Sequence, residues 1–213
     1  MKSFKIHLIR CGYTENTLKG VYEGQTPDEP LCEQSIKQIN QMQEEYNYPD
    51  VNIVFLPNHE RCFDTYMLLW PDAKYAKMND FSEMSFGEFE GKTADELAED
   101  ENYQKWLKAN AEFAPPGGEN GMEFSERVCS AFIKIVDAMI STNSGDVAII
   151  APGGVIMTIC KFFATPEMEM TDWLTPPGCG YTLRTDGMLW RNTGKCEALY
   201  ELPYSTQEID YEF

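Results

Sequence analysis

A chain of 213 residues with 43% apolar content is long enough to bury one sizeable core, so a single domain is the simplest expectation. The formal net charge of −18 argues against nucleic acids and anionic membrane surfaces as partners. Seven cysteines without regular spacing and without a Cys-x-x-Cys pair indicate reduced thiols in a cytoplasm rather than disulfides or a zinc site. We therefore expect a cytoplasmic protein that holds neither a metal ion nor a cofactor.

The first apolar run, Phe4 to Ile9, predicts a short buried strand. Charged residues interrupt this run, so it is not a signal peptide. The strand ends at Arg10-Cys11-Gly12, where the glycine permits a sharp exit and a close approach of the backbone to a ligand. Ligands of open α/β sheets gather at the carboxyl ends of strands, so these three residues mark a candidate site.

The remaining elements follow in chain order. Apolar residues at helical spacing predict three helices, at 33–46, from 57 towards 70, and at 124–140. Short apolar runs predict further strands, at 52–56, 146–150, 181–184 and 196–201. The longest apolar stretch, 147–164, contains a proline, two glycines and a lysine, so we expect a strand, a turn and a helix rather than a membrane span. The acidic tail, 205–213, is expected to be frayed.

The amino-terminal stretch resembles the signature of the histidine phosphatase superfamily, the phosphoglycerate mutase-like phosphatases. That signature usually reads Leu-Ile-Arg-His-Gly-Glu-Thr, followed by Asn and then by Gly-Gln-Thr. Cys11 stands at the position of the histidine that the family phosphorylates. The positions that match are Arg10, Gly12, Thr14, Asn16, Gly24, Gln25 and Thr26.

A second histidine position also differs from the family. The family's Ser-His-Gly-Gly corresponds to Ala151-Pro152-Gly153-Gly154, so Pro152 takes the place of a histidine in the pocket. Proline offers no charge, no proton and no N–H donor. The chain has only two histidines, His7 and His59, and neither falls at a catalytic position of the family.

Residues 57–65 resemble the family segment Ser-Ser-Pro-Leu-x-Arg-Ala-x-Gln-Thr, in which Arg61 and Thr65 match. The resemblance implies that Arg61 reaches a phosphate near the amino terminus of a helix, which itself attracts anions. An ordinary surface arginine is the alternative. His59 replaces an apolar residue of the motif, and the sequence leaves open whether its ring faces the pocket. His7 lies in the first strand and is expected to be a buried, hydrogen-bonded core residue.

Residues 81–93 resemble the family segment Leu-x-Glu-x-x-Phe-Gly-x-x-Glu-Gly-x-Thr, in which Glu83 holds the place of the general acid. Such an acid must stay protonated until it protonates the leaving oxygen. A solvated carboxylate in a charged loop is the alternative. Residues 94–126 resemble the family's cap insertion, helical around 103–111, which covers the pocket and sets substrate choice.

The resemblance implies a three-layer α/β/α sandwich with a mostly parallel sheet, formed by one domain, 1–213, with a small helical cap insertion at about 94–126. It implies catalytic positions at Cys11 and Glu83, with His59 and Pro152 at the pocket. The residues expected to bind phosphate are Arg10, Gly12, Asn16, Arg61 and Gly153.

Two functional hypotheses follow. In the first, the protein is a degenerate phosphatase that binds a phosphorylated small molecule, inorganic phosphate or a protein partner without turnover. In the second, it is a phosphoric monoester hydrolase of altered chemistry, with Cys11 as nucleophile and Glu83 as general acid. We favour the first, because two catalytic positions are changed and the loss of a nucleophile alone costs on the order of 10⁶ in rate. Whether Cys11 is an activated thiol or an inert, buried one stays open.

Overall fold

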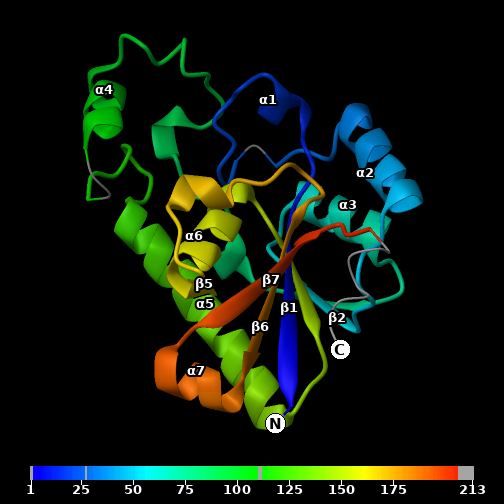
Figure 1. Ribbon diagram of the computed structural model, residues 1–213. Helices are drawn as coiled ribbons and strands as arrows, with labels where there is room; N and C mark the ends of the chain where they lie inside the picture. The colour runs from blue at the N-terminus through cyan, green and yellow to red at the C-terminus, as the bar shows by residue number, and fades with distance from the viewer. Residues whose placement is uncertain (1, 27, 110–111, 206–213) are drawn as a thin grey trace.

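The computed structural model describes residues 2–26, 28–109 and 112–205. These residues form a seven-stranded sheet with the order β3-β2-β4-β1-β6-β7-β5 (Figure 1). The strands are β1 (Ser3–Arg10), β2 (Ile53–Leu56), β3 (Lys74–Lys77), β4 (Val147–Ala151), β5 (Ala164–Thr165), β6 (Gly180–Asp186) and β7 (Cys196–Leu202).

Most of the strand pairs are parallel, as predicted. β1 pairs with β4, β4 with β2, β2 with β3, and β5 with β7 in parallel, whereas β6 is antiparallel to both β1 and β7. The carboxyl ends of β1, β2, β3 and β4 therefore meet at one edge of the sheet, which lies at the top of Figure 1. This edge is where an open parallel sheet places its ligand.

Helices cover both faces of the sheet. In Figure 1, α2 (Glu33–Glu45) and α3 (Glu60–Leu69) lie on one side, and α5 (Gly121–Thr142) and α6 (Gly153–Phe163) on the other. This arrangement confirms the predicted three-layer α/β/α sandwich. The shorter helices are α1 (Glu15–Leu18), α4 (Glu101–Lys108) and α7 (Gly187–Thr193), and the 3₁₀ helices are η1 (Asn79–Phe81), η2 (Gly87–Phe89) and η3 (Met170–Trp173).

The alternation of side chains along β1 builds two cores at once. Ile6 and Leu8 belong to the cluster beneath α5 and α6, whereas Ile9 belongs to the cluster beneath α2 and α3. All three are fully buried, because successive side chains of a strand point to opposite faces and both faces are covered. The central strands are thereby fixed, and so is the edge at which they end.

The structure departs from the predicted elements in a few places. The helix expected around 103–111 begins at Glu101, because the Asp100 carboxylate accepts the N–H groups of Asn102 and Tyr103 as an N-cap. It ends at Lys108, and residues 110–111 lie outside the described part of the chain, as does the tail from 206 onwards.

Other elements have bounds that the sequence did not predict. α5 begins at Gly121, within the range expected for the cap insertion, where Asn120 and Glu123 form a reciprocal capping box. β3 was not predicted, because its four residues are mostly exposed and carry two lysines. Within the described ranges, no helix is long and apolar enough to cross a membrane.

His7 is a buried core residue, as predicted. Its side chain is 1% exposed, and its Nδ1 lies 2.9 Å from Thr182 Oγ1 on the neighbouring strand β6. Burial disfavours the imidazolium and lowers the pKa of His7 from 6.5 to about 4, against the opposing effect of the Asp146 carboxylate.

This shift predicts a pH-dependent loss of stability. Between pH 6.5 and about 4 the unfolded chain binds a proton at His7 that the folded chain does not, so the free energy of unfolding falls as the pH falls through this range. The contribution of His7 amounts to about 3 kcal/mol. Urea unfolding at pH 7 and at pH 4 measures this effect in the wild type and in a His7→Gln variant. Between pH 7 and pH 4 the unfolding free energy of the wild type should fall by about 3 kcal/mol more than that of the variant. A difference that does not change with pH would contradict the assignment.

Candidate functional site

A cavity of about 200 Å³ lies at the carboxyl edge of the parallel strands. The end of β1, the first turn of α3, the loop before η2 and the residues after β4 meet there. It is lined by Arg10, Cys11, Gly12, Tyr13, Thr17, Val21, Tyr22, Glu23, Arg61, Glu83, Phe86, Pro152 and Gly153.

Backbone hydrogen bonds fix the end of β1 at this cavity. The Arg10 N–H donates to the carbonyl of Cys179, and the Cys11 N–H donates to that of Ala151 on β4. The Gly12 N–H donates to Thr65 Oγ1 of α3 at 3.0 Å. A Cβ atom at Gly12 would lie 2.5 Å from the Oγ atom of Ser35, so no larger residue fits there without a shift.

Arg61 enters the cavity from the first turn of α3 and is only 2% exposed, so it is not an ordinary surface arginine. Its Nη2 donates to the carbonyl of Gly24 at 3.0 Å. Its Nη1 lies 3.1 Å from Glu23 Oε1, which makes a buried ion pair. Nη1 makes no hydrogen bond with any described residue, so its contact with Glu23 is an ion pair alone.

The Glu23 carboxylate is held from its other side as well. Its Oε2 accepts hydrogen bonds from the hydroxyls of Thr14 at 2.5 Å and Thr17 at 2.7 Å, and the side chain is buried. The sequence analysis missed Glu23 as a site residue. No local pattern could have revealed it, because its partner Arg61 lies 38 residues further along the chain.

Glu83 also lines the cavity, but its carboxylate is already engaged. Oε1 accepts the N–H of Met84 at 2.9 Å, and Oε2 accepts the N–H of Gly154 at 3.1 Å. Gly154 lies in the first turn of α6, whose N-cap residue Pro152 provides no side-chain hydrogen bond. The Glu83 carboxylate therefore caps this helix, a position at which the helix dipole favours an anion. It is not a freely solvated side chain.

The loop that carries Glu83 is anchored to α5. Arg127 Nη2 donates to the carbonyl of Glu83 at 2.9 Å, and its Nη1 donates to that of Ser82 at 2.9 Å. Arg127 also pairs with Glu119, whose Oε1 accepts the N–H of Ser85 at 2.8 Å. Arg127 and Glu119 together thus hold the loop of Glu83 in place.

Cys11 is the thiol of the site. It is 5% exposed at the cavity wall, and Cys62 of α3 belongs to the same buried cluster. Interaction with the Cys62 thiol lowers the pKa of Cys11, as do the nearby guanidinium groups of Arg61 and Arg10, whereas burial opposes the shift. Burial and the interaction with Cys11 raise the pKa of Cys62 well above the ordinary thiol value, so Cys62 is the thiol of the two that keeps its proton.

The other predicted site residues are divided between this cavity and its surroundings. Pro152 and Gly153 line the cavity, and a Cβ atom at Gly153 would lie 3.1 Å from Arg10 Nε, so the guanidinium packs against this backbone. Asn16 is not among the residues that line the cavity. His59 is buried and lines a neighbouring cavity of about 350 Å³, with its Nδ1 3.5 Å from Asp28 Oδ1.

Aromatic side chains connect one wall of the cavity to α4. Tyr22 and Phe86 both line the cavity, and their ring centroids lie 5.7 Å and 6.0 Å from that of Trp106 on α4. The Tyr22 and Tyr103 hydroxyls are 2.8 Å apart. The helix between the Glu83 loop and α5 therefore packs directly behind two residues that a ligand in the cavity would touch.

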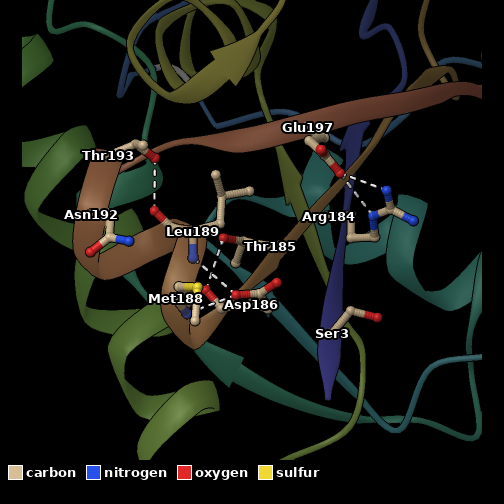
Figure 2. A pocket seen from close by; sticks show the side chains of 9 residues that line it. All are labelled: Ser3, Arg184, Thr185, Asp186, Met188, Leu189, Asn192, Thr193 and Glu197. Atoms are coloured by element: carbon tan, nitrogen blue, oxygen red, sulfur yellow. Dashed lines mark hydrogen bonds and ion pairs between the residues drawn. The ribbon is translucent and has the colours of Figure 1, made fainter. Parts of the chain in front are cut away.

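A larger cavity, of about 550 Å³, lies at the opposite end of the sheet, where β1 starts and α7 follows β6 (Figure 2). Its charged groups are engaged in structural contacts. Arg184 Nη2 donates to Glu197 at 2.6 Å, and the Asp186 carboxylate accepts the N–H groups of Met188 and Leu189 as the N-cap of α7. We therefore place the candidate site at the smaller cavity, where arginine, carboxylate and thiol groups converge.

Several known proteins are similar to this chain. Two adenosylcobalamin/alpha-ribazole phosphatases, from Escherichia coli and Salmonella typhimurium, are 24% and 26% identical to this chain over 180 residues, covering 82% of it and 87% of each relative. The solved structure of an alpha-ribazole phosphatase from Shigella flexneri has a TM-score of 0.74 at 24% identity, covering 84% of this chain and 90% of that one. A phosphoglycerate mutase from Bacillus anthracis has a TM-score of 0.72 at 17% identity, with coverage of 87% and 89%.

The TM-scores of these two structures show a shared fold. Because each structure is less than 25% identical to the chain, the likeness shows the fold alone. The family assignment comes from the family model for the histidine phosphatase superfamily (branch 1), which matches residues 6–194. The match spans most of the chain. It begins within β1, includes Arg10, Arg61 and Glu83, and ends just after α7. The chain belongs to the histidine phosphatase superfamily.

Proposed function

We propose that this protein binds a phosphorylated small molecule in the cavity at the end of β1, without phosphohistidine turnover. The observation that carries the proposal is the Nη1 group of Arg61, a buried cationic donor with no hydrogen-bond partner among the described residues. This atom faces the Glu23 carboxylate at 3.1 Å without a hydrogen bond, so an oxyanion with well-aligned acceptors would add a charge-assisted hydrogen bond of roughly 1.5–3 kcal/mol. Arg10 lines the same cavity and supplies a second guanidinium group.

The relatives support a small phosphate ester as the ligand class, since two of them are named as phosphatases of adenosylcobalamin or alpha-ribazole phosphates. We further propose that the segment carrying α4 selects the organic part of the ligand. Tyr22 and Phe86 present aromatic surface to the cavity, and Trp106 of α4 supports both rings. The seven free cysteines fit a reducing cytoplasm as the place where this binding occurs.

The absence of phosphohistidine turnover is inferred from the two positions at which the family's histidines are replaced. Cys11 cannot form phosphohistidine, and Pro152 has neither a charge nor a proton to give. Glu83, at the position of the family's general acid, accepts the N–H groups of Met84 and Gly154 with its two oxygens. In this proposal, Arg10 and Arg61 bind the ligand, and binding does not require the two replaced histidines.

The affinity for phosphate should be weak, because the site already contains an internal anion. The Glu23 carboxylate neutralises much of the charge on Arg61, and Thr14 and Thr17 hold it in position. A Glu23→Gln substitution keeps the shape and removes the charge, so phosphate should compete better for the guanidinium. A charge-assisted hydrogen bond contributes roughly 1.5–3 kcal/mol, which corresponds to a Kd at least about tenfold lower.

The first test of this proposal is the increase in Tm that phosphate or vanadate causes at millimolar concentration. We expect a small increase for the wild type and a larger one for Glu23→Gln, because only ligands that prefer the folded state raise Tm. The increase should vanish in the double variant Glu23→Gln/Arg61→Gln. The double variant is preferable to Arg61 substitution alone, since removing one partner of a buried ion pair leaves the other uncompensated.

Each variant is compared with itself in matched chloride at equal ionic strength, so a change in intrinsic stability does not affect the reading. A wild type and a Glu23→Gln variant that both show no increase in Tm would refute phosphate binding at this cavity.

The second test concerns the covalent chemistry. Incubation with 2,3-bisphosphoglycerate should leave no acid-labile, base-stable phosphate on the chain, because neither of the two histidines lines the cavity. His7 is buried within β1, and His59 lies at the neighbouring cavity. Phosphate found on either histidine by mass spectrometry would overturn this part of the proposal.

A second candidate function is supported by one observation, the lowered pKa of Cys11 at the wall of the cavity. In that case Cys11 attacks phosphorus, the P–O bond to the leaving group breaks, and water later hydrolyses the phosphocysteine. The sequence weighs against it, since the chain lacks the Cys-x₅-Arg loop with which cysteine phosphatases surround a phosphate. We therefore expect no hydrolysis of p-nitrophenyl phosphate above background. Turnover that is present in the wild type and absent in Cys11→Ser would establish the second function in place of the first.

A further inference from the structure

Cys62 is a buried nucleophilic group that the proposed function does not use. It is fully buried in the first turn of α3, one residue after Arg61. The backbone also holds the two elements together, since Gly12 donates to Thr65 Oγ1, one turn further along α3. Thr65 Oγ1 in turn donates to the carbonyl of Arg61 at 2.7 Å, so one hydroxyl bridges the backbone next to Cys11 and the backbone next to Cys62, and both cysteines belong to the same buried cluster.

The two thiols differ in their access to solvent and in their surroundings. Cys11 lines the open cavity with the guanidinium groups of Arg10 and Arg61 beside it, whereas Cys62 lies behind Cys11 and is closed off from solvent. A thiolate is the form that reacts with peroxides, and cationic surroundings stabilise it. A small oxidant entering the cavity therefore meets Cys11 first and Cys62 not at all.

We propose that Cys11 and Cys62 form an oxidisable pair, in which a hydroperoxide oxidises Cys11 and Cys62 resolves the product to an intramolecular disulfide. The pair would place a reversible redox modification in the wall of the ligand cavity. The chemistry does not depend on whether the cavity binds a phosphorylated ligand, because it requires only the two thiols and access for the oxidant.

The steps balance with hydrogen peroxide as the oxidant. The Cys11 thiolate attacks one peroxide oxygen, an S–O bond forms, the O–O bond breaks, and hydroxide leaves, so that sulfur loses two electrons and peroxide gains them. The sulfur of Cys62 then attacks that of Cys11, an S–S bond forms and the S–O bond breaks. The hydroxide released in this second step takes the thiol proton of Cys62 and becomes water. The hydroxide released in the first step takes the proton that the Cys11 thiol lost on ionisation, so the products are one disulfide and two water molecules. The bond requires the two sulfur atoms to approach to about 2.05 Å.

The chain contains a matched control pair. Cys160 of α6 and Cys196 of β7 are both fully buried in the other core cluster, and neither lines the cavity that contains Cys11. Burial raises the pKa of both thiols, that of Cys196 to about 12, and Cys196 contributes to the increase at Cys160. These two thiols belong to one buried cluster, and no guanidinium group contributes to their pKa shifts, so they should resist oxidation.

The sequence makes the products easy to identify. Trypsin cleaves after Arg10 and Arg61, so each of the two cysteines becomes the first residue of its own peptide, 11–19 or 62–74, and each peptide contains a single cysteine. The full-length, fully reduced protein is treated with increasing hydrogen peroxide at neutral pH, blocked with iodoacetamide in denaturant, digested and analysed by mass spectrometry.

We expect a dithiothreitol-sensitive species joining peptides 11–19 and 62–74, formed at a peroxide concentration at least tenfold below that needed to oxidise Cys160 or Cys196. In Cys62→Ser the disulfide should be lost, and dimedone should capture sulfenic acid on Cys11. The wild-type result stands without the variant, should Cys62→Ser fail to fold. Absence of the cross-linked species, or equal oxidation of the control pair, would refute the inference. If the same reduced protein still shows a phosphate-induced increase in Tm, the proposed function survives that refutation.

Discussion

The buried ion pair between Arg61 and Glu23 is the interaction on which the site depends. Taking both charges out of water costs several kcal/mol per ion, and the cost is offset only when each group also finds hydrogen bonds. Glu23 finds them at the hydroxyls of Thr14 and Thr17, and Arg61 at the carbonyl of Gly24. The pair therefore connects α3 to the segment after β1, and it determines how much charge Arg61 can offer a ligand.

A second carboxylate plays a comparable part on the other wall. Glu83 caps α6 through Gly154, and Arg127 fixes the loop that carries it. The cavity thus holds two guanidinium groups and two carboxylates that the protein itself keeps in place. Because these four charges balance, we expect the proposed binding of an anion to be weak.

Much of the fold could be predicted from the sequence, because periodicity reports burial. β1 and β4 are covered on both faces and read as apolar runs, and α2 and α5 show the spacing of helices with one buried face. β3 escaped prediction, since an exposed edge strand with two lysines carries no such pattern. α4 begins two residues earlier than predicted because Asp100 caps it, and such a local polar contact leaves no periodic pattern in the sequence.

The site was predictable only in part. Motif positions located Arg10, Cys11, Arg61, Glu83 and Gly153, and the structure brings all five to one cavity. It places Asn16 away from the lining and His59 at the neighbouring cavity. Glu23 and the proposed pairing of Cys62 with Cys11 could not be found in the same way, because both depend on how β1, the segment after it and α3 come together. Such pairings arise from the tertiary fold and leave no periodic trace in the sequence.

The most direct test of the central claim is a crystal structure of the Glu23→Gln variant grown with vanadate. The account predicts an oxyanion within hydrogen-bonding distance of Arg61 Nη1 and Arg10, beside the sulfur of Cys11 and with no bond to either histidine. Vanadate bound elsewhere, or a cavity that stays empty while Arg61 keeps its contact with the residue at position 23, would contradict it.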